Sequence, residues 1–145
     1  MKRILAGLMC WMGFMVMPAV ATTVEQWGVF EISLEGPETG NPFVEVQFGA
    51  RFTDGHGSVA VRGFYDGEGV YRVRFMPPRV GQWRYVTESN RWELTNHQGS
   101  VDVVVPGPGN HGKVKVYQDY HFIYEDGTPY RPIGTTIYSW LNRPA

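Results

Sequence analysis

The side chains in this sequence that could do chemistry are mainly carboxylates and histidines, but the carboxylates do not have the spacing of a catalytic pair. Catalysis by a carboxylate pair needs an acid and a nucleophile whose carboxyl groups lie roughly 5 Å apart across a cleft. The adjacent residues Glu125 and Asp126 do not supply that, because Asp126 precedes Gly127 in a turn, where an aspartate caps its own backbone. Asp66 and Glu68 lie in a second glycine-rich turn. We therefore predict turn roles for these carboxylates.

The histidines lack metal-ligand spacing and have no neighbouring cysteine, so we expect neither a metal nor a cofactor. The sequence also has no recognisable nucleophile–histidine set and no glycine loop that leads from a strand into a helix to bind phosphate. His56 and His97 lie in polar turns and are expected to face solvent. His111 lies in a glycine-rich stretch, where it either packs between two domains or faces solvent.

The aromatic side chains could form a core or contact a sugar. Trp83 and Tyr85 stand at alternate positions of one predicted strand, so they share a face, and the core is the favoured place for both. Trp92 lies between Arg91 and Glu93 near a turn. It is either an exposed ring that contacts glycan or a partly buried edge residue, and the second interpretation is favoured.

These residues lie in a chain with a β pattern. Apolar and polar residues alternate in Phe30–Glu35 and in Val44–Phe52, and Asp66–Gly69 is a hairpin signal. We also expect a short strand at Arg91–Thr95. Turn signals recur throughout and no helical period persists, which predicts an all-β, antiparallel, immunoglobulin-like sandwich of about seven strands over residues 24–105. A barrel of the same strands is the alternative.

The predicted core of this sandwich consists of the large apolar side chains that alternate along the strands: Phe30, Ile32, Val46, Phe48, Phe52, Val61, Tyr71, Val73, Phe75, Trp83, Tyr85 and Val103.

The N-terminal 21 residues have the order of a secretory signal peptide. Lys2 and Arg3 precede an apolar run, and Ala19-Val20-Ala21 supplies small residues for cleavage after Ala21. We therefore expect export to the periplasm or the extracellular space. The net charge of the whole chain is −1, and loss of the two basic residues makes it more acidic. Neither nucleic acid nor, after cleavage, a membrane is an expected partner.

The C-terminal part follows the linker Pro106–Gly112, in which prolines add stiffness and glycines allow turns. Lys113–Tyr117 and Tyr120–Tyr124 are short β-prone runs. An Asp-Gly turn follows them, and Pro132–Ile137 is predicted to be a further, apolar strand.

Several runs occur in the same order as in the N-terminal immunoglobulin-like domain, of unassigned function, that precedes apiosidase-like glycoside hydrolase barrels. Each run is weak alone, and the ordered set covers nearly all of the chain after the signal peptide. The runs that carry this resemblance are Val24–Glu31, Gly40–Phe43, Gly63–Gly69, Arg74–Pro78, Gly81–Tyr85, Gly109–Gly112, Phe122–Pro129 and Pro132–Thr136.

This resemblance implies four segments: a signal peptide (1–21), the sandwich (24–105), a linker (106–118) and the truncated start of a barrel (119–145). Family members are expected to be exported bacterial enzymes that act on plant cell-wall or related polysaccharides, with catalytic carboxylates on later barrel strands. The first barrel strand would place four side chains in the substrate pocket of the parent enzyme: Thr135, Thr136, Tyr138 and Trp140.

The leading hypothesis is a non-catalytic accessory module of an exported glycoside hydrolase, carried on a truncated chain. Its expected partner is its own missing barrel, and polysaccharide is a further candidate partner. The alternative is an independent secreted carbohydrate-binding or cell-surface adhesion sandwich. We do not expect the chain to be an enzyme, because it shows no acid/base pair.

Overall fold

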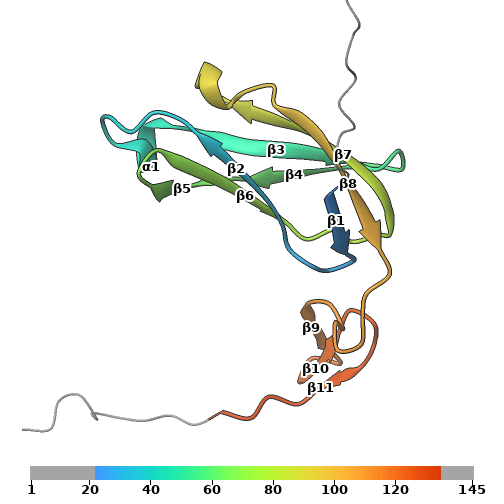
Figure 1. The fold of residues 1–145 in the computed structure, drawn as a ribbon. Helices are drawn as coiled ribbons and strands as arrows, with labels where there is room; N and C mark the ends of the chain where they lie inside the picture. Colours follow the sequence, from blue (N-terminus) through green and yellow to red (C-terminus); the bar gives the residue numbers. More distant parts are fainter. Residues whose placement is uncertain (1–21, 135–145) are drawn as a thin grey trace, which may run out of the picture.

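The computed structural model describes residues 22–134, which form an all-β fold. Its larger part has two sheets (Figure 1): sheet A has the strand order β1-β8-β7-β3-β4, and sheet B has the order β2-β6-β5. The strands are β1 (Thr22–Glu25), β2 (Phe30–Glu35), β3 (Phe48–Thr53), β4 (Ser58–Arg62), β5 (Phe64–Gly67), β6 (Val70–Phe75), β7 (Gly81–Ser89) and β8 (Gln98–Val104).

Sheets A and B pack face to face because both present large apolar side chains at alternate positions. Phe52 of β3 stacks on Phe75 of β6 with ring centroids 3.9 Å apart, and Phe75 lies 5.1 Å from the ring of Trp83 on β7. All three side chains are buried. The indole N–H of Trp83 donates to the carbonyl of Arg79 at 3.0 Å, so its polar group has a partner inside the fold. The predicted all-β sandwich is confirmed.

The core agrees closely with the prediction. The predicted residues that are buried are Phe30, Ile32, Phe48, Phe52, Tyr71, Val73, Phe75, Trp83 and Val103. The predicted residues that are partly buried and pack against this core are Val46, Val61 and Tyr85. Core residues that the alternation did not predict are Ala50, Leu94 and Val101.

The hairpin predicted at Asp66–Gly69 is confirmed, since β5 pairs with β6 in antiparallel register across it. Strand pairing is antiparallel in the sandwich except at one place. There β1 lies parallel to β8, with Val24 opposite Val103. The parallel pair places β1 beside β8, with the ends of both strands, Glu25 and Val104, at the same level.

One predicted strand begins later than expected, and another is wrong. The predicted run Val44–Phe52 is a strand only from Phe48, where β3 begins. Its first two residues lie in the short helix α1 (Pro42–Glu45), and Val44 is 76% exposed. Proline at the first helical position favours this start. The Asn90 side chain then fixes the exit: its Nδ2 donates to the Glu45 carbonyl and its Oδ1 accepts from the Gln47 N–H, both at 2.9 Å.

The second error is at Arg91–Thr95, which contains the 3₁₀ turn η1 (Trp92–Leu94) and no strand. Leu94 is fully buried and Trp92 is 81% exposed. A tight turn sends neighbouring side chains in different directions, and burial of Leu94 in the core favours it over an extended segment.

A third, smaller sheet follows the linker. It has the order β11-β10-β9, formed by β9 (Val114–Tyr117), β10 (His121–Tyr124) and β11 (Pro129–Tyr130). The predicted Asp-Gly turn is confirmed: Gly127 has φ +89° and its N–H donates to the Tyr124 carbonyl at 3.0 Å. Of the predicted strand Pro132–Ile137, residues 132–134 form no strand, and the remainder lies outside the described residues.

Within residues 22–134 no helix is long and apolar enough to cross a membrane.

Candidate functional site

Asn110 ties the linker to the sandwich. Its Nδ2 donates to Glu25 Oε2 and to the backbone carbonyl of Gln26, both at 3.0 Å. The N–H of Gln26 in turn donates to the carbonyl of Val104 at 2.8 Å, which joins the ends of β1 and β8. Asn110 Oδ1 also accepts from the N–H of Gly112 at 3.3 Å. One amide side chain therefore fastens the linker to the sandwich and turns the chain.

His111, the next residue, ties the linker to the small sheet. Its Nδ1 lies 2.8 Å from Asp126 Oδ2 in the β10–β11 turn, and its ring centroid lies 5.2 Å from that of Tyr124. Its carbonyl accepts from the N–H of Asp126 at 3.3 Å. The side chain is 38% exposed. The His111 ring therefore packs on the small sheet and is also partly open to solvent.

Gly112 allows a close approach between the two parts. It has φ +79°, and a Cβ added there would lie 2.8 Å from Trp27 Cδ2 and 2.8 Å from Glu125 Cβ. Trp27, which follows β1, itself has φ +63°, and its N–H donates to the carbonyl of Pro77 at 3.0 Å. We call Asn110, His111 and Gly112, with the residues they contact, the joint. Sequence reasoning missed the role of Trp27, although its place beside Gly28 hinted at a turn.

Hydrogen bonds to carboxylates set the electrostatics of the joint. The Asn110 amide, together with the N–H of Gly107, holds the pKa of Glu25 below its ordinary value. The N–H of Thr128 and then His111 hold the pKa of Asp126 below its ordinary value. Both carboxylates are therefore stabilised in the charged form, and the joint is made of charge-assisted hydrogen bonds on each side.

The carboxylates considered for catalysis serve turns and ion pairs. Asp126 Oδ1 accepts from the N–H of Thr128 at 2.9 Å. The turn role predicted for Asp66 is wrong, because Asp66 lies in β5. Its Oδ2 lies 2.6 Å from Arg72 Nε, and Arg72 also contacts Glu31 on the neighbouring strand. Among residues 22–134 no group of three or more histidine, cysteine or acidic side chains could hold a metal ion.

The predicted site residues fall in two groups. Trp92 is 81% exposed on η1, so of its two interpretations the exposed ring is observed. In Figure 1, η1 is the yellow helical turn at the end of the sandwich remote from the small sheet. The residues predicted to line the barrel pocket lie outside the described residues: Thr135, Thr136, Tyr138 and Trp140.

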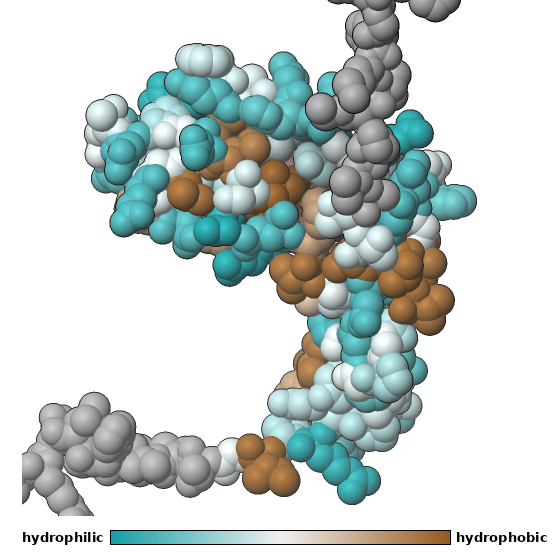
Figure 2. Space-filling view, viewed as in Figure 1, coloured by the Kyte–Doolittle hydropathy of each residue, from teal (hydrophilic) through white to brown (hydrophobic). Residues whose placement is uncertain are grey.

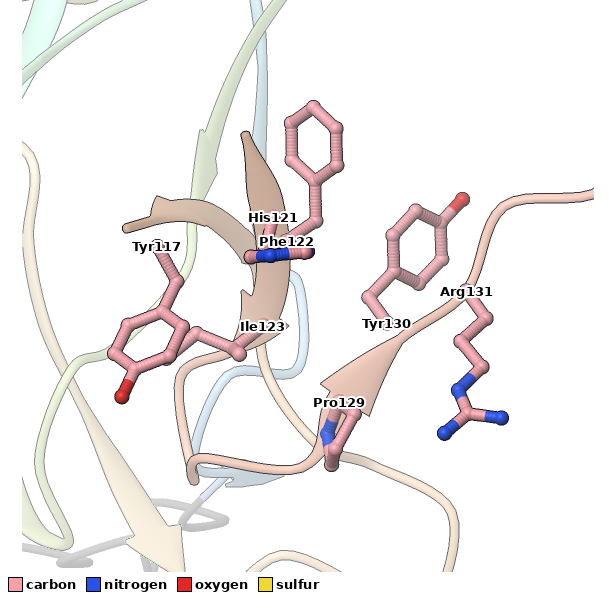
Figure 3. Close-up of a pocket in the computed structure, with 7 residues that line it drawn as sticks. All are labelled: Tyr117, His121, Phe122, Ile123, Pro129, Tyr130 and Arg131. Atoms are coloured by element: carbon pink, nitrogen blue, oxygen red, sulfur yellow. The ribbon is translucent and has the colours of Figure 1, made fainter. Parts of the chain in front are cut away.

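The small sheet carries an open cavity of about 260 Å³ that is rich in aromatic side chains. Figure 3 shows its lining, with Tyr117 from β9, Phe122 from β10 and Tyr130 from β11. Tyr117 and Phe122 are 46% and 44% exposed. Apolar rings exposed in this way on a three-stranded sheet mark a surface that another structure can cover.

These observations define a class: an all-β sandwich joined through short-range contacts to a small sheet with exposed aromatic rings. Residues 23–90, from β1 to the end of β7, match the family model described as "Domain of unknown function (DUF5060)". A search of curated proteins finds no match.

Among solved structures, the chain is similar to one described as the crystal structure of a "putative glycoside hydrolase" from Bacteroides vulgatus. The identity is 43% and the TM-score 0.75, over 86% of this chain. The chain spans only 24% of the length of that protein.

Proposed function

We propose that this chain is a non-catalytic accessory module, N-terminal in its parent protein, of an exported glycoside hydrolase that acts on plant-type or related polysaccharide. One observation carries the proposal: 43% identity to the protein described as a "putative glycoside hydrolase", over 86% of this chain but only 24% of that protein. An accessory module is expected to match a relative in this way, with most of the relative left for other domains.

The finer parts of the proposal rest on sequence. The basic, apolar and small-residue order of the N-terminus supports export. The ordered motifs support an immunoglobulin-like sandwich that precedes an apiosidase-like barrel. The parallel pairing of β1 with β8 beside otherwise antiparallel strands is compatible with that sandwich type.

The joint holds the sandwich and the small sheet together, and we assign this positioning role to the module. Asn110 and His111 are adjacent, and each bonds to a different part of the structure, so the linker has little freedom between its two anchors. The aromatic cavity of the small sheet is the surface that we assign to contact with the catalytic part. A module held in this way presents one fixed face to its enzyme.

A chimera tests the proposal. In the matched Bacteroides protein, the matching segment is deleted in one variant and replaced by this chain in another. We expect the deletion to lower the melting temperature of the remaining protein and the replacement to restore most of the loss. A chimera no more stable than the deletion variant would refute the assignment to such enzymes.

The isolated chain provides the test of the non-catalytic part. Incubated with aryl glycosides and wall polysaccharides, it is expected to release no sugar. Turnover that survives repurification and is abolished by one carboxylate substitution would overturn this part of the proposal.

The second candidate is an independent secreted carbohydrate-binding or adhesion sandwich. Exposure of Trp92 favours it, since an aromatic ring in solvent can stack on the C–H face of a sugar. Polysaccharide binding by the chain, together with failure of the chimera, would select this candidate.

A further inference from the structure

A groove of about 920 Å³ crosses the end of the sandwich opposite the joint. It runs from α1 over β3 and β4 to the end of β7 and lies on described residues throughout. Its volume falls within the range of about 300–1,000 Å³ typical of ligand sites. Figure 1 shows α1 at the end of the sandwich away from β9–β11, so the groove stays open when the small sheet is covered.

The floor of the groove is open because small residues form it. Gly49 and Ala60 lie on neighbouring strands, and Gly49 pairs with Arg62. A Cβ added at Gly49 would lie 2.7 Å from the carbonyl oxygen of Val61, so the strand pairing itself keeps this position free of a side chain.

Phe43 forms an apolar wall with its ring held in place. The ring is 74% exposed, yet it makes an edge contact with Tyr65 at 5.1 Å between centroids. The Tyr65 hydroxyl in turn accepts from the N–H of Gly69 at 3.1 Å, which fixes the ring beneath Phe43. An exposed aromatic ring with a fixed support offers a flat face with little entropy left to lose on binding.

Polar groups complete the lining. Arg62 and Gln47 are exposed and line the groove, and Glu88 lies across from Gly49 and pairs with Arg51 at 2.9 Å. The groove therefore combines one exposed ring with amide, guanidinium and carboxylate groups, and it has little net charge. A neutral sugar, which has an apolar C–H face and hydroxyl edges, complements this mixture better than a strongly charged ligand does.

We propose that this groove binds a segment of a neutral polysaccharide chain, with the ring of Phe43 against the C–H face of a pyranose and the polar lining bonded to its hydroxyls. The ligand class rests on the proposed link to a glycoside hydrolase, and the site itself rests on the groove. Binding here holds a catalytic part near its substrate without taking part in bond cleavage.

Affinity electrophoresis of the purified chain in gels with β-glucan, arabinoxylan, galactomannan or arabinogalactan tests the site. We expect retention by at least one polysaccharide and a loss of affinity of about tenfold in Phe43→Ala, as for an aromatic anchor of an interface. Because Phe43 is largely exposed, this variant should fold, which far-UV circular dichroism checks. Tyr120→Ala is the matched control, since Tyr120 is 88% exposed near the small sheet, and it should bind unchanged.

Three outcomes overturn the site: no retention by any neutral polysaccharide, equal loss in Phe43→Ala and Tyr120→Ala, or a loss in Trp92→Ala while Phe43→Ala binds fully. The last result would move glycan contact from the groove to η1. Each can occur while the chimera still restores stability, so failure of the groove and failure of the accessory role are distinguishable.

Discussion

Replacing Gly112 by alanine should open the joint, and Gly109 offers a matched control. Both glycines have positive φ, +79° and +90°, so alanine carries a backbone cost of about 1–2 kcal/mol at either position. At Gly109 an added Cβ meets nothing within 4 Å, whereas at Gly112 it meets Trp27 and Glu125 at 2.8 Å. The overlap adds about 1–3 kcal/mol. The difference between the two variants isolates the contact from the backbone strain.

Hydrogen exchange measures this difference. The N–H of Gly112 donates to Asn110 Oδ1 and the N–H of Asp126 to the carbonyl of His111, so both amides report opening of the joint. An added 1–3 kcal/mol corresponds to about 5- to 140-fold faster exchange at Asp126 in Gly112→Ala than in Gly109→Ala. Amides in the sandwich core should change little, because the joint lies outside it.

Equal acceleration in the two variants would refute the reasoning. It would mean that backbone strain alone explains the effect and that the approach of Trp27 to Gly112 does not hold the two parts together. Acceleration throughout the sandwich in Gly112→Ala would also contradict it, because the joint would then be inseparable from the core.

Three further predictions follow from other contacts. Phe52→Ala, which removes a fully buried ring stacked on Phe75, should lower the free energy of unfolding by about 3–5 kcal/mol in urea denaturation. Acid should open the joint, because folding lowers the pKa values of Glu25 and Asp126. The stability that these two carboxylates contribute is full above their ordinary pKa values of 4.5 and 3.8, and it is lost as the pH falls through the folded pKa values. Small-angle scattering during an acid titration should detect the opening. The whole chain should self-associate more than one ending at Gly112, because the longer chain exposes apolar residues of the small sheet, such as Val116 at 65%; equal light scattering from the two chains would contradict this.

Much of the sandwich was predictable because alternation is a local property. In β3 and β6 each buried side chain is followed by a more exposed one, as the period-2 pattern requires. The hairpin at Asp66–Gly69 was predictable for the same reason, since its Asp-Gly signal is local. In the structure Gly67 and Gly69 have the positive φ that this turn requires.

The late start of β3 and the missing strand at Arg91–Thr95 show where local pattern is insufficient. The run from Val44 alternates well, but Asn90, distant in sequence, fixes the exit of α1 and delays the strand until Phe48. At η1 the decisive term is burial of Leu94 in a core that forms only when both sheets assemble.

The sequence by itself therefore predicted the all-β fold class, the turn role of Asp126 and a resemblance to part of a glycoside hydrolase. Tertiary structure alone decided the joint and the groove. The Asn110–Glu25 bond spans 85 positions of the chain, and the groove combines α1 with strands from two later segments. Such sites depend on which distant segments become neighbours. Hydrophobic alternation specifies which face of a strand is buried, but not which strand lies beside it.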